Sequence, residues 1–221
     1  MDSAESRRPQ HSPRPGGQRG HAPRPVKLLI AGGPGAGKTT FLRTTAGSAL
    51  TTTLDHPTGR HPATLQPVRL EFGRVTLDPE LVLYLFGTPE PDPAWRRWDE
   101  LAGGAIGAVV LADPCRLQDC FVALDYFEQR DLPFVVGLNR FGPMTHTADD
   151  VREALVVGPD VPVMFCDARL AVSAGAVLRR LLGHAIARTA TCRDGIGRLH
   201  RRMIGAPLLT DHRHTSTRSA R

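Results

Sequence analysis

The segment that most constrains this chain is "AGGPGAGKTT", residues 31–40, which directly follows the apolar run "VKLLI". Gly32, Gly37, Lys38 and Thr39 match the spacing G-x-x-x-x-G-K-[ST]. An apolar run of strand length before this motif and a helical pattern after it are the expected context of a phosphate-binding loop, or P-loop. In such a loop, glycines let successive backbone N–H groups surround a phosphate at the start of a helix. The segment therefore predicts a site for the phosphates of a nucleotide.

Each residue type in the loop has an expected task. The Lys38 ammonium is predicted to neutralise β- and γ-phosphate oxygens, and the Thr39 hydroxyl is the predicted metal ligand, for Mg²⁺. Only two of the 28 basic residues are lysines, Lys27 and Lys38, so a lysine is kept where a compact ammonium is needed. The residues predicted to bind nucleotide phosphates are Gly32, Gly33, Pro34, Gly35, Ala36, Gly37, Lys38, Thr39 and Thr40.

Apolar runs of strand length alternate with helical patterns along the chain. The runs cover residues 26–32, 68–77, 81–87, 105–113, 133–139 and 161–167. Most of them are apolar throughout, which is typical of strands covered on both faces by helices. The predicted helices cover residues 38–47, 94–102, 117–129, 148–155 and 170–187. The sequence thus predicts an α/β fold with a six-stranded, mostly parallel sheet and helices on both faces.

Two connections differ from this alternation. The gap between the second and third strands is too short for a crossover helix, so "RVTLDPELV" predicts a hairpin and one antiparallel strand. Residues 48–66, between the first helix and the second strand, are predicted to form a long polar loop. Loops of that length inside compact domains are often functional.

Positive charge is concentrated at the two ends of the chain. The formal net charge is +6, but residues 26–187 hold 15 basic and 18 acidic side chains, so the excess lies outside them. We therefore expect a disordered, basic, Pro/Arg-rich tail (1–25), one nucleotide-binding domain (26–187) and a mostly disordered basic tail (188–221). The acidic balance of the domain argues against a specific nucleic-acid partner.

The cysteines and apolar segments predict a cytoplasmic protein. Four cysteines form neither a CxxC pair nor a dense framework, which fits reduced thiols. No apolar run approaches the roughly 18 residues of a membrane span, and the N-terminus has charges and prolines where a signal peptide is apolar. The segment "GIGRLHRRMIG" (195–205) has two interpretations: a basic amphipathic helix for weak contact with an anionic membrane surface or a partner, or part of a disordered tail.

Several further motifs carry a resemblance. The run "LVLYLFGTPEPDPAWRRWDELAGGAIGAVVLAD" (81–113), together with "EFGRV", "DYFEQRDLPFVVGLN" and "CDAR", resembles the small GTPase-like proteins of actinobacterial conservons. These proteins are relatives of the bacterial polarity GTPase MglA and share the Ras-like fold. The resemblance covers residues 26–187 and implies binding of GTP or GDP with Mg²⁺. It also implies two partners, a roadblock-type protein and a sensor-kinase-like membrane protein, which would recruit the chain to the inner face of the membrane.

The switch motifs differ from those of the family. The threonine that closes over the metal in the family falls on Pro67, which has no hydroxyl and no N–H, and Thr64 lies three residues earlier. The family's "F-G-T-P-G-Q" reads "FGTPEP" here, so Glu90 brings negative charge toward the γ-phosphate and Pro91 cannot orient water. Gly87 stands where Ras-type proteins carry a magnesium-associated Asp, an absence that the family shares.

The base-reading motifs are partly retained. Asn139 matches the Asn of the guanine-reading N-K-x-D motif, but Gly142 occupies the place of its Asp, so the grip on the guanine N1–H and amino group is lost. The resemblance leaves the Ala168 backbone N–H as a contact for guanine O6. The implied base-side residues are Asn139, Arg140, Cys166, Asp167 and Ala168. A weakened guanine preference is expected, with ATP as an alternative ligand.

Three side chains allow two interpretations each. Trp95 and Trp98 lie three residues apart on one predicted helix, and we favour a core and a rim position over a partner-facing pair. Asp113, at the end of a predicted strand, is interpreted as a loop cap rather than as a catalyst. Cys166 is interpreted as a buried core residue. No residue is assigned a catalytic role.

Together these features predict a GTP-binding regulatory module of a signalling complex with very slow or no intrinsic hydrolysis. The closing threonine, the γ-phosphate contact and the water-orienting residue are all altered at once. Three alternatives stay open: a GTPase switch completed by a partner in trans, an ATP-using P-loop protein, and a scaffold that works without nucleotide.

Overall fold

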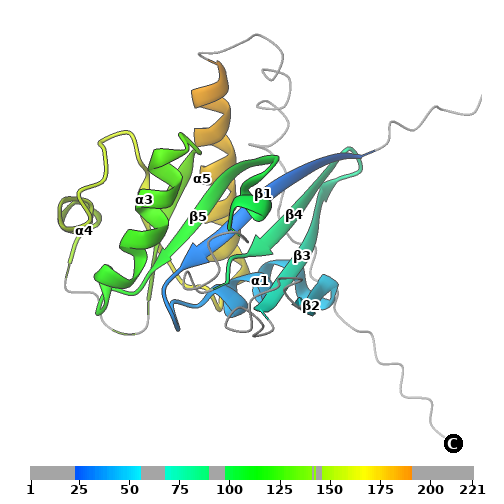
Figure 1. Cartoon of the computed structure of the whole chain (residues 1–221), viewed down its shortest axis with the longest axis horizontal. Coiled ribbons are helices and arrows are strands. Elements are labelled where there is room, and N and C mark those ends of the chain that lie inside the picture. The colour runs from blue at the N-terminus through cyan, green and yellow to red at the C-terminus, as the bar shows by residue number, and fades with distance from the viewer. Residues whose placement is uncertain (1–22, 56–67, 90–97, 141, 143–145, 191–221) are drawn as a thin grey trace, which may run out of the picture.

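A seven-stranded sheet crosses the computed structural model, which describes residues 23–55, 68–89, 98–140, 142 and 146–190 (Figure 1). The strand order is β2-β3-β4-β1-β5-β6-β7. The strands are β1 (Arg24–Gly32), β2 (Leu50–Asp55), β3 (Val68–Asp78), β4 (Leu81–Gly87), β5 (Ala105–Ala112), β6 (Phe134–Asn139) and β7 (Val163–Cys166). β3 is antiparallel to both of its neighbours, whereas the other pairs are parallel. The predicted mostly parallel α/β sheet and the β3–β4 hairpin are therefore confirmed.

The helices lie close to their predicted positions. They are α1 (Lys38–Ala46), α3 (Phe121–Gln129), α4 (Ala148–Ala154) and α5 (Ala171–Ala190), with short 3-10 helices at Gly47–Ala49 and Leu117–Cys120. Residues 98–102 are also helical, and the preceding part of the predicted helix, residues 94–97, lies outside the described residues. β1 starts two residues before the predicted domain boundary at 26, and α5 continues three residues past the boundary at 187.

The prediction of six strands and a loop over 48–66 was wrong in part. Residues Leu50–Asp55 form β2, which pairs antiparallel with β3 along the edge of the sheet. Thr51, Thr52 and Thr53 are all exposed, so this strand has no apolar alternation that would reveal it in the sequence. β-branched threonines favour extended backbone, and pairing with β3 supplies the hydrogen bonds. Residues 56–67 lie outside the described part of the chain.

Two hydrophobic cores, one on each face of the sheet, explain why the strands are apolar throughout. On one face Leu28 and Ile30 of β1 pack with residues of α1 and α5. On the other face Leu29 and Ala31 pack with Trp98 and with residues of α3 and α4. Neighbouring side chains of a strand point to opposite faces, so a strand between two helix layers must be apolar at every position.

β1 lies where the strand order reverses. Strands β2 to β4 lie on one side of β1 and strands β5 to β7 lie on the other, so β1 pairs with β4 and with β5. In open α/β sheets, ligands bind at such a switch point, beyond the carboxyl ends of the strands. The P-loop follows β1 directly and therefore lies at this position. In the part of the chain that the structure describes, no helix is both long enough and apolar enough to span a membrane.

Close contact between α1 and β3 depends on a glycine. A Cβ atom at Gly73 would lie 2.8 Å from the Cβ atom of Ala46, whereas a Cβ atom at Gly183 of α5 would meet nothing within 4 Å. We expect Gly73→Ala to lower the free energy of unfolding by about 1–3 kcal/mol, because a packed helix must move away. Gly183→Ala is the matched control and should raise it by about 0.5–1 kcal/mol through helix propensity. Urea unfolding of both variants measures this, and equal effects would contradict the packing argument.

Candidate functional site

Two glycines of the P-loop, residues 32–39, have backbone conformations and surroundings that exclude a side chain. Gly32 has φ 141° and Gly37 has φ 102°, both in the region that favours glycine. A Cβ atom at Gly32 would lie 2.3 Å from the Leu111 carbonyl oxygen, and one at Gly37 would lie 2.3 Å from Nδ2 of Asn139. The loop is thus packed between the end of β5 and the end of β6.

The N-terminus of α1 attracts anions. The first N–H groups of a helix have no acceptor within the helix, and the helix dipole adds partial positive charge there. α1 has no acidic residue in its first turn. The Lys38 ammonium donates hydrogen bonds to the carbonyl oxygens of Gly32 (2.9 Å) and Gly33 (3.0 Å), which holds its charge over the loop. Backbone donors and an ammonium therefore converge where the sequence predicts phosphates.

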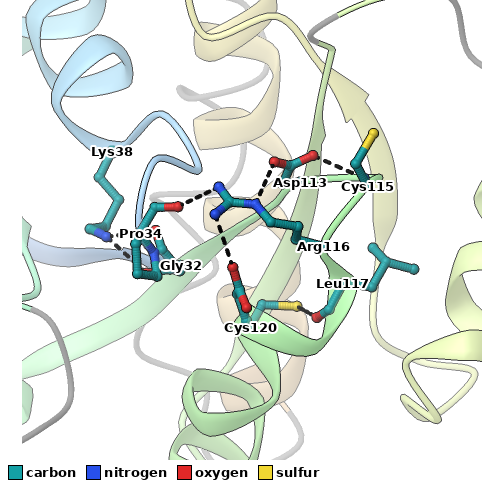
Figure 2. A network of polar contacts seen from close by, with 10 residues as sticks. Gly32, Pro34, Lys38, Asp113, Cys115, Arg116, Leu117 and Cys120 are labelled. Atoms are coloured by element: carbon teal, nitrogen blue, oxygen red, sulfur yellow. Dashed lines mark hydrogen bonds and ion pairs between the residues drawn. The ribbon is translucent and has the colours of Figure 1, made fainter.

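Figure 2 shows a second cation at this loop, the guanidinium of Arg116, which follows β5. Its Nη2 atom donates to the Pro34 carbonyl oxygen at 2.7 Å, and its Nε atom donates to Oδ2 of Asp113 at 3.3 Å. Its Nη1 atom lies 3.6 Å from Oδ2 of Asp119. Two carboxylates thus orient a guanidinium that contacts the outer side of the P-loop.

Asp113 also organises its own loop, as predicted for a loop cap. Its Oδ1 atom accepts the backbone N–H of Cys115 at 2.9 Å. The Arg116 side chain is 45% exposed, so its ion pairs are screened by water and contribute little stability. The ion pairs instead orient the Arg116 side chain. Its hydrogen bond to Pro34 then connects the segment after β5 to the P-loop.

Asn139 joins the P-loop to the turn after β7. This residue ends β6 and is 3% exposed. Its Nδ2 atom donates to the Ala36 carbonyl oxygen at 2.9 Å, and its Oδ1 atom accepts the Ala168 N–H at 3.0 Å. The Ala168 N–H, predicted as a contact for guanine O6, is therefore donated to Asn139 in this structure. The amide holds together the two loops expected to surround a base.

The turn after β7 is held by an ion pair. Asp167 accepts hydrogen bonds from Nε (2.9 Å) and Nη2 (2.8 Å) of Arg169, and these bonds lower the pKa of the Asp167 carboxyl to about 2. Arg140 is exposed, and its backbone N–H donates to the Cys166 carbonyl oxygen at 2.8 Å. The Cys166 side chain is fully buried, and burial raises the pKa of its thiol to about 11. The predicted core position of Cys166 is confirmed, and its side chain supports the turn.

Packing does not explain the glycine at position 142. Gly142 is exposed, and a Cβ atom there would meet no atom of the described residues within 4 Å. A carboxylate would therefore fit sterically at the place where the resembling family carries its guanine-reading Asp. Steric hindrance from the described residues therefore does not explain why this position lacks an Asp.

Trp98 is a core residue, as favoured from the sequence. It is 1% exposed, its Nε1 atom donates to the Pro89 carbonyl oxygen at 3.0 Å, and its ring contacts those of Tyr126 and Phe127. It therefore anchors the chain just after β4. The other residues discussed for the switch segments, Thr64, Pro67, Glu90, Pro91 and Trp95, lie outside the described residues.

Sequence reasoning missed two charged residues near this site, Arg116 and Glu71. Glu71 lies in β3, is 8% exposed, and pairs across the sheet with Gly87. One signal could have identified it: Glu71 shares a strand face with Val75, which is in the core, so a carboxylate occurs where the period-two pattern requires an apolar residue. Arg116 has no comparable signal, because its contact with Pro34 joins positions 82 residues apart.

A metal ion at this site would need ligands from the nucleotide and water in addition to protein side chains. Among the described residues, no group of three or more His, Cys, Asp or Glu side chains could hold a metal ion. Mg²⁺ in nucleotide sites commonly uses only one or two protein oxygens together with phosphates and water. Thr39, exposed in the first turn of α1, fits such a limited set.

Comparison with solved structures shows that the fold is similar to that of the G domain of an iron transporter. The G domain of the T. maritima FeoB iron transporter matches with a TM-score of 0.53 and 17% identity over 74% of this chain and 98% of that domain. The FeoB cytosolic domain in a GDP form matches with a TM-score of 0.56 and 16% identity, over 74% of this chain and 64% of that domain. The same domain in a GMPPNP form has a TM-score of 0.54.

Comparisons at the level of sequence add no relative. No protein-family profile matches the chain, and no curated protein matches it. At 16–17% identity the structural likeness establishes the fold alone.

The Asn139 bridge can be tested by removing it. Asn139→Ala would leave the buried Ala36 carbonyl and Ala168 N–H without partners, so the free energy of unfolding should fall by about 2–4 kcal/mol. Arg169→Ala is the control, because its ion pair is exposed and should contribute less than about 1 kcal/mol. Chemical denaturation measures both. Similar losses in the two variants would show that the bridge is not a main support of the site.

Proposed function

We propose that this chain is a GTP-binding regulatory module of a signalling complex, with very slow or no intrinsic hydrolysis. The observation that carries the proposal is the arrangement of the P-loop: an unneutralised helix start, Lys38 held over the loop and Asn139 bridging to the turn after β7. Backbone donors at a helix start bind phosphate oxygens, and a nearby compact cation strengthens that binding. The proposed phosphate-binding residues are those of the motif, from Gly32 to Thr40, with Thr39 as metal ligand for Mg²⁺.

Guanine is the proposed base, and ATP is the weaker alternative. Asn139 occupies the end of β6, next to Arg140 and the Cys166–Ala168 turn. The FeoB cytosolic domain, a protein of similar fold, exists in GDP and GMPPNP forms, which supports a guanine nucleotide by analogy of fold. Gly142 argues against strong selectivity for guanine over adenine, because it offers no carboxylate to the guanine N1–H and amino group. We therefore propose a preference for GTP and GDP that is smaller than in proteins that carry this Asp.

The regulatory role rests on the resemblance to conservon-type relatives of MglA. On that basis we propose a domain over residues 26–187 flanked by basic tails, in a cytoplasmic protein that works with a roadblock-type protein and a sensor-kinase-like membrane protein. Recruitment to the inner face of the membrane would come from the partner, with a weak contribution from the basic segment 195–205. A partner that supplies an arginine in trans could complete the hydrolytic site.

The two lysines of the chain provide a matched test of nucleotide binding. We expect wild-type protein to bind GDP and GTP more tightly than ATP, with a dependence on Mg²⁺, in calorimetric titrations. Lys38→Ala should weaken binding at least about tenfold, because it removes charge-assisted hydrogen bonds to phosphate. Lys27→Ala is the control, since Lys27 donates to Gly103 and lies five residues before Gly32 on β1, roughly 17 Å away. No binding of any of the three nucleotides would refute the proposal and favour a scaffold.

Hydrolysis is a separate prediction. Single-turnover assays should show GTP cleavage no faster than about 10⁻⁴ per second, the order of an unassisted Ras-type protein. The double change Glu90→Gly with Pro91→Gln restores the family's residues and tests whether these two positions alone account for slow turnover. Wild-type cleavage on the order of 1 per second without a partner would instead identify a working GTPase.

A further inference from the structure

An open groove of about 470 Å³ lies between α3 and the helical segment 98–102. The Tyr126 hydroxyl donates to Oδ1 of Asp99 at 2.9 Å, and the Arg130 guanidinium forms an ion pair with the same carboxylate. Cζ of Arg130 also lies 3.7 Å from the centroid of the Tyr126 ring. These contacts fix the side chains on one wall of the groove. The lining residues are Asp99, Val122, Asp125, Tyr126, Gln129 and Arg130.

The exposed face of α3 combines carboxylates with apolar side chains. Asp125 and Glu128 are exposed, and among the described residues neither forms an ion pair. Phe121 and Val122, at the start of the helix, are each 37% exposed. Positions three and four apart are neighbours on a helix, so these four side chains share the solvent side of α3. Such a face is complementary to a basic segment that also carries apolar side chains.

The end of α5 lies beside the end of α3. Arg188, in the last turn of α5, forms an ion pair with Asp131, the second residue after α3. Only residues 191–194 separate α5 from the segment 195–205, and in extended form they span up to about 13 Å. The nine residues of α3 form a helix about 14 Å long. The segment 195–205 is therefore close enough to lie along α3.

The segment 195–205, "GIGRLHRRMIG", has both properties that this face requires. It contains three arginines and no acidic residue. Ile196, Leu199 and Met203 recur at helical spacing, so one side of a helix there would be apolar. The N-terminal residues 1–22 are also basic, but they contain no Leu, Ile, Val or Phe. They match the charge of the groove and not its apolar part, which favours the C-terminal segment as the occupant.

We propose that residues 195–205 dock as a short helix in the groove along α3. Their arginines would face Asp125 and Glu128, and their apolar side chains would face Phe121 and Val122. A short tether keeps the effective concentration of the segment in the millimolar range, so weak contacts suffice to hold it. In the docked state the arginines are not available to an anionic membrane surface, and the proposed membrane contact requires release of the segment. Docking does not depend on nucleotide binding.

Hydrogen exchange of the full chain, followed by mass spectrometry, tests the docking. The amides of residues 195–205 should exchange at least about tenfold more slowly than those of an unstructured peptide of the same sequence. Asp125→Asn with Glu128→Gln removes two carboxylates from the groove and should abolish most of this protection. Asp149→Asn with Glu153→Gln removes the same charge from exposed positions of α4 and is the matched control. The amides of α3 report whether each variant is folded.

A second pair of variants tests the apolar contacts. Leu199→Asp should also remove the protection, whereas Leu208→Asp, three residues beyond the segment, should keep it. Unprotected wild-type amides at 195–205, or protection that survives both groove and Leu199 changes, would overturn the proposal. Protection that rises with protein concentration would assign the segment to a second copy, and protection only with phosphatidylserine vesicles would assign it to a membrane. Protection of residues 1–22 instead would assign the groove to the N-terminal tail. Each of these three results also overturns the proposal.

Discussion

The candidate site depends on the two hydrogen bonds of the buried Asn139 side chain. One bond fixes the Ala36 carbonyl in the P-loop, and the other fixes the Ala168 N–H in the turn after β7. The same amide lies 2.3 Å from where a Cβ atom at Gly37 would be, so the position of Asn139 excludes a side chain at residue 37. A buried donor and acceptor must both be satisfied, which makes this one side chain a determinant of where both loops lie.

The parts of the candidate site differ in how fully they match the motifs expected from the sequence. On the phosphate side the loop, the helix start and Lys38 agree with one another, and Arg116 supports the loop from outside. On the proposed base side Gly142 carries no carboxylate, although none of the described residues would block one there. In the β3–β4 pair, Gly87 lacks a side chain and the buried Glu71 lies directly opposite. The proposed function separates nucleotide binding from hydrolysis, since the two depend on different residues.

Much of the fold could be predicted because the apolar pattern of a strand depends on which of its faces are buried. Runs that are apolar at every position occur where a strand lies between two layers of helices, and the six predicted strands are such segments or their hairpin partner. β2 could not be predicted in this way. Its threonines are exposed, so no apolar pattern marks it, and only the unpaired edge of β3 makes it a strand. A polar edge strand depends on its partner more than on its own side chains.

By itself, the sequence determined the P-loop and the class of fold, because both follow from local rules: glycine conformations, the start of a helix and the alternation of apolar segments. Only the tertiary structure decided that Arg116 contacts the P-loop, that Asn139 holds the Ala168 N–H, and that Glu71 lies opposite Gly87. These contacts join residues that are 82, 29 and 16 positions apart. The physical reason is that strand register and loop packing bring distant residues together, and no local pattern records which side chains will then meet.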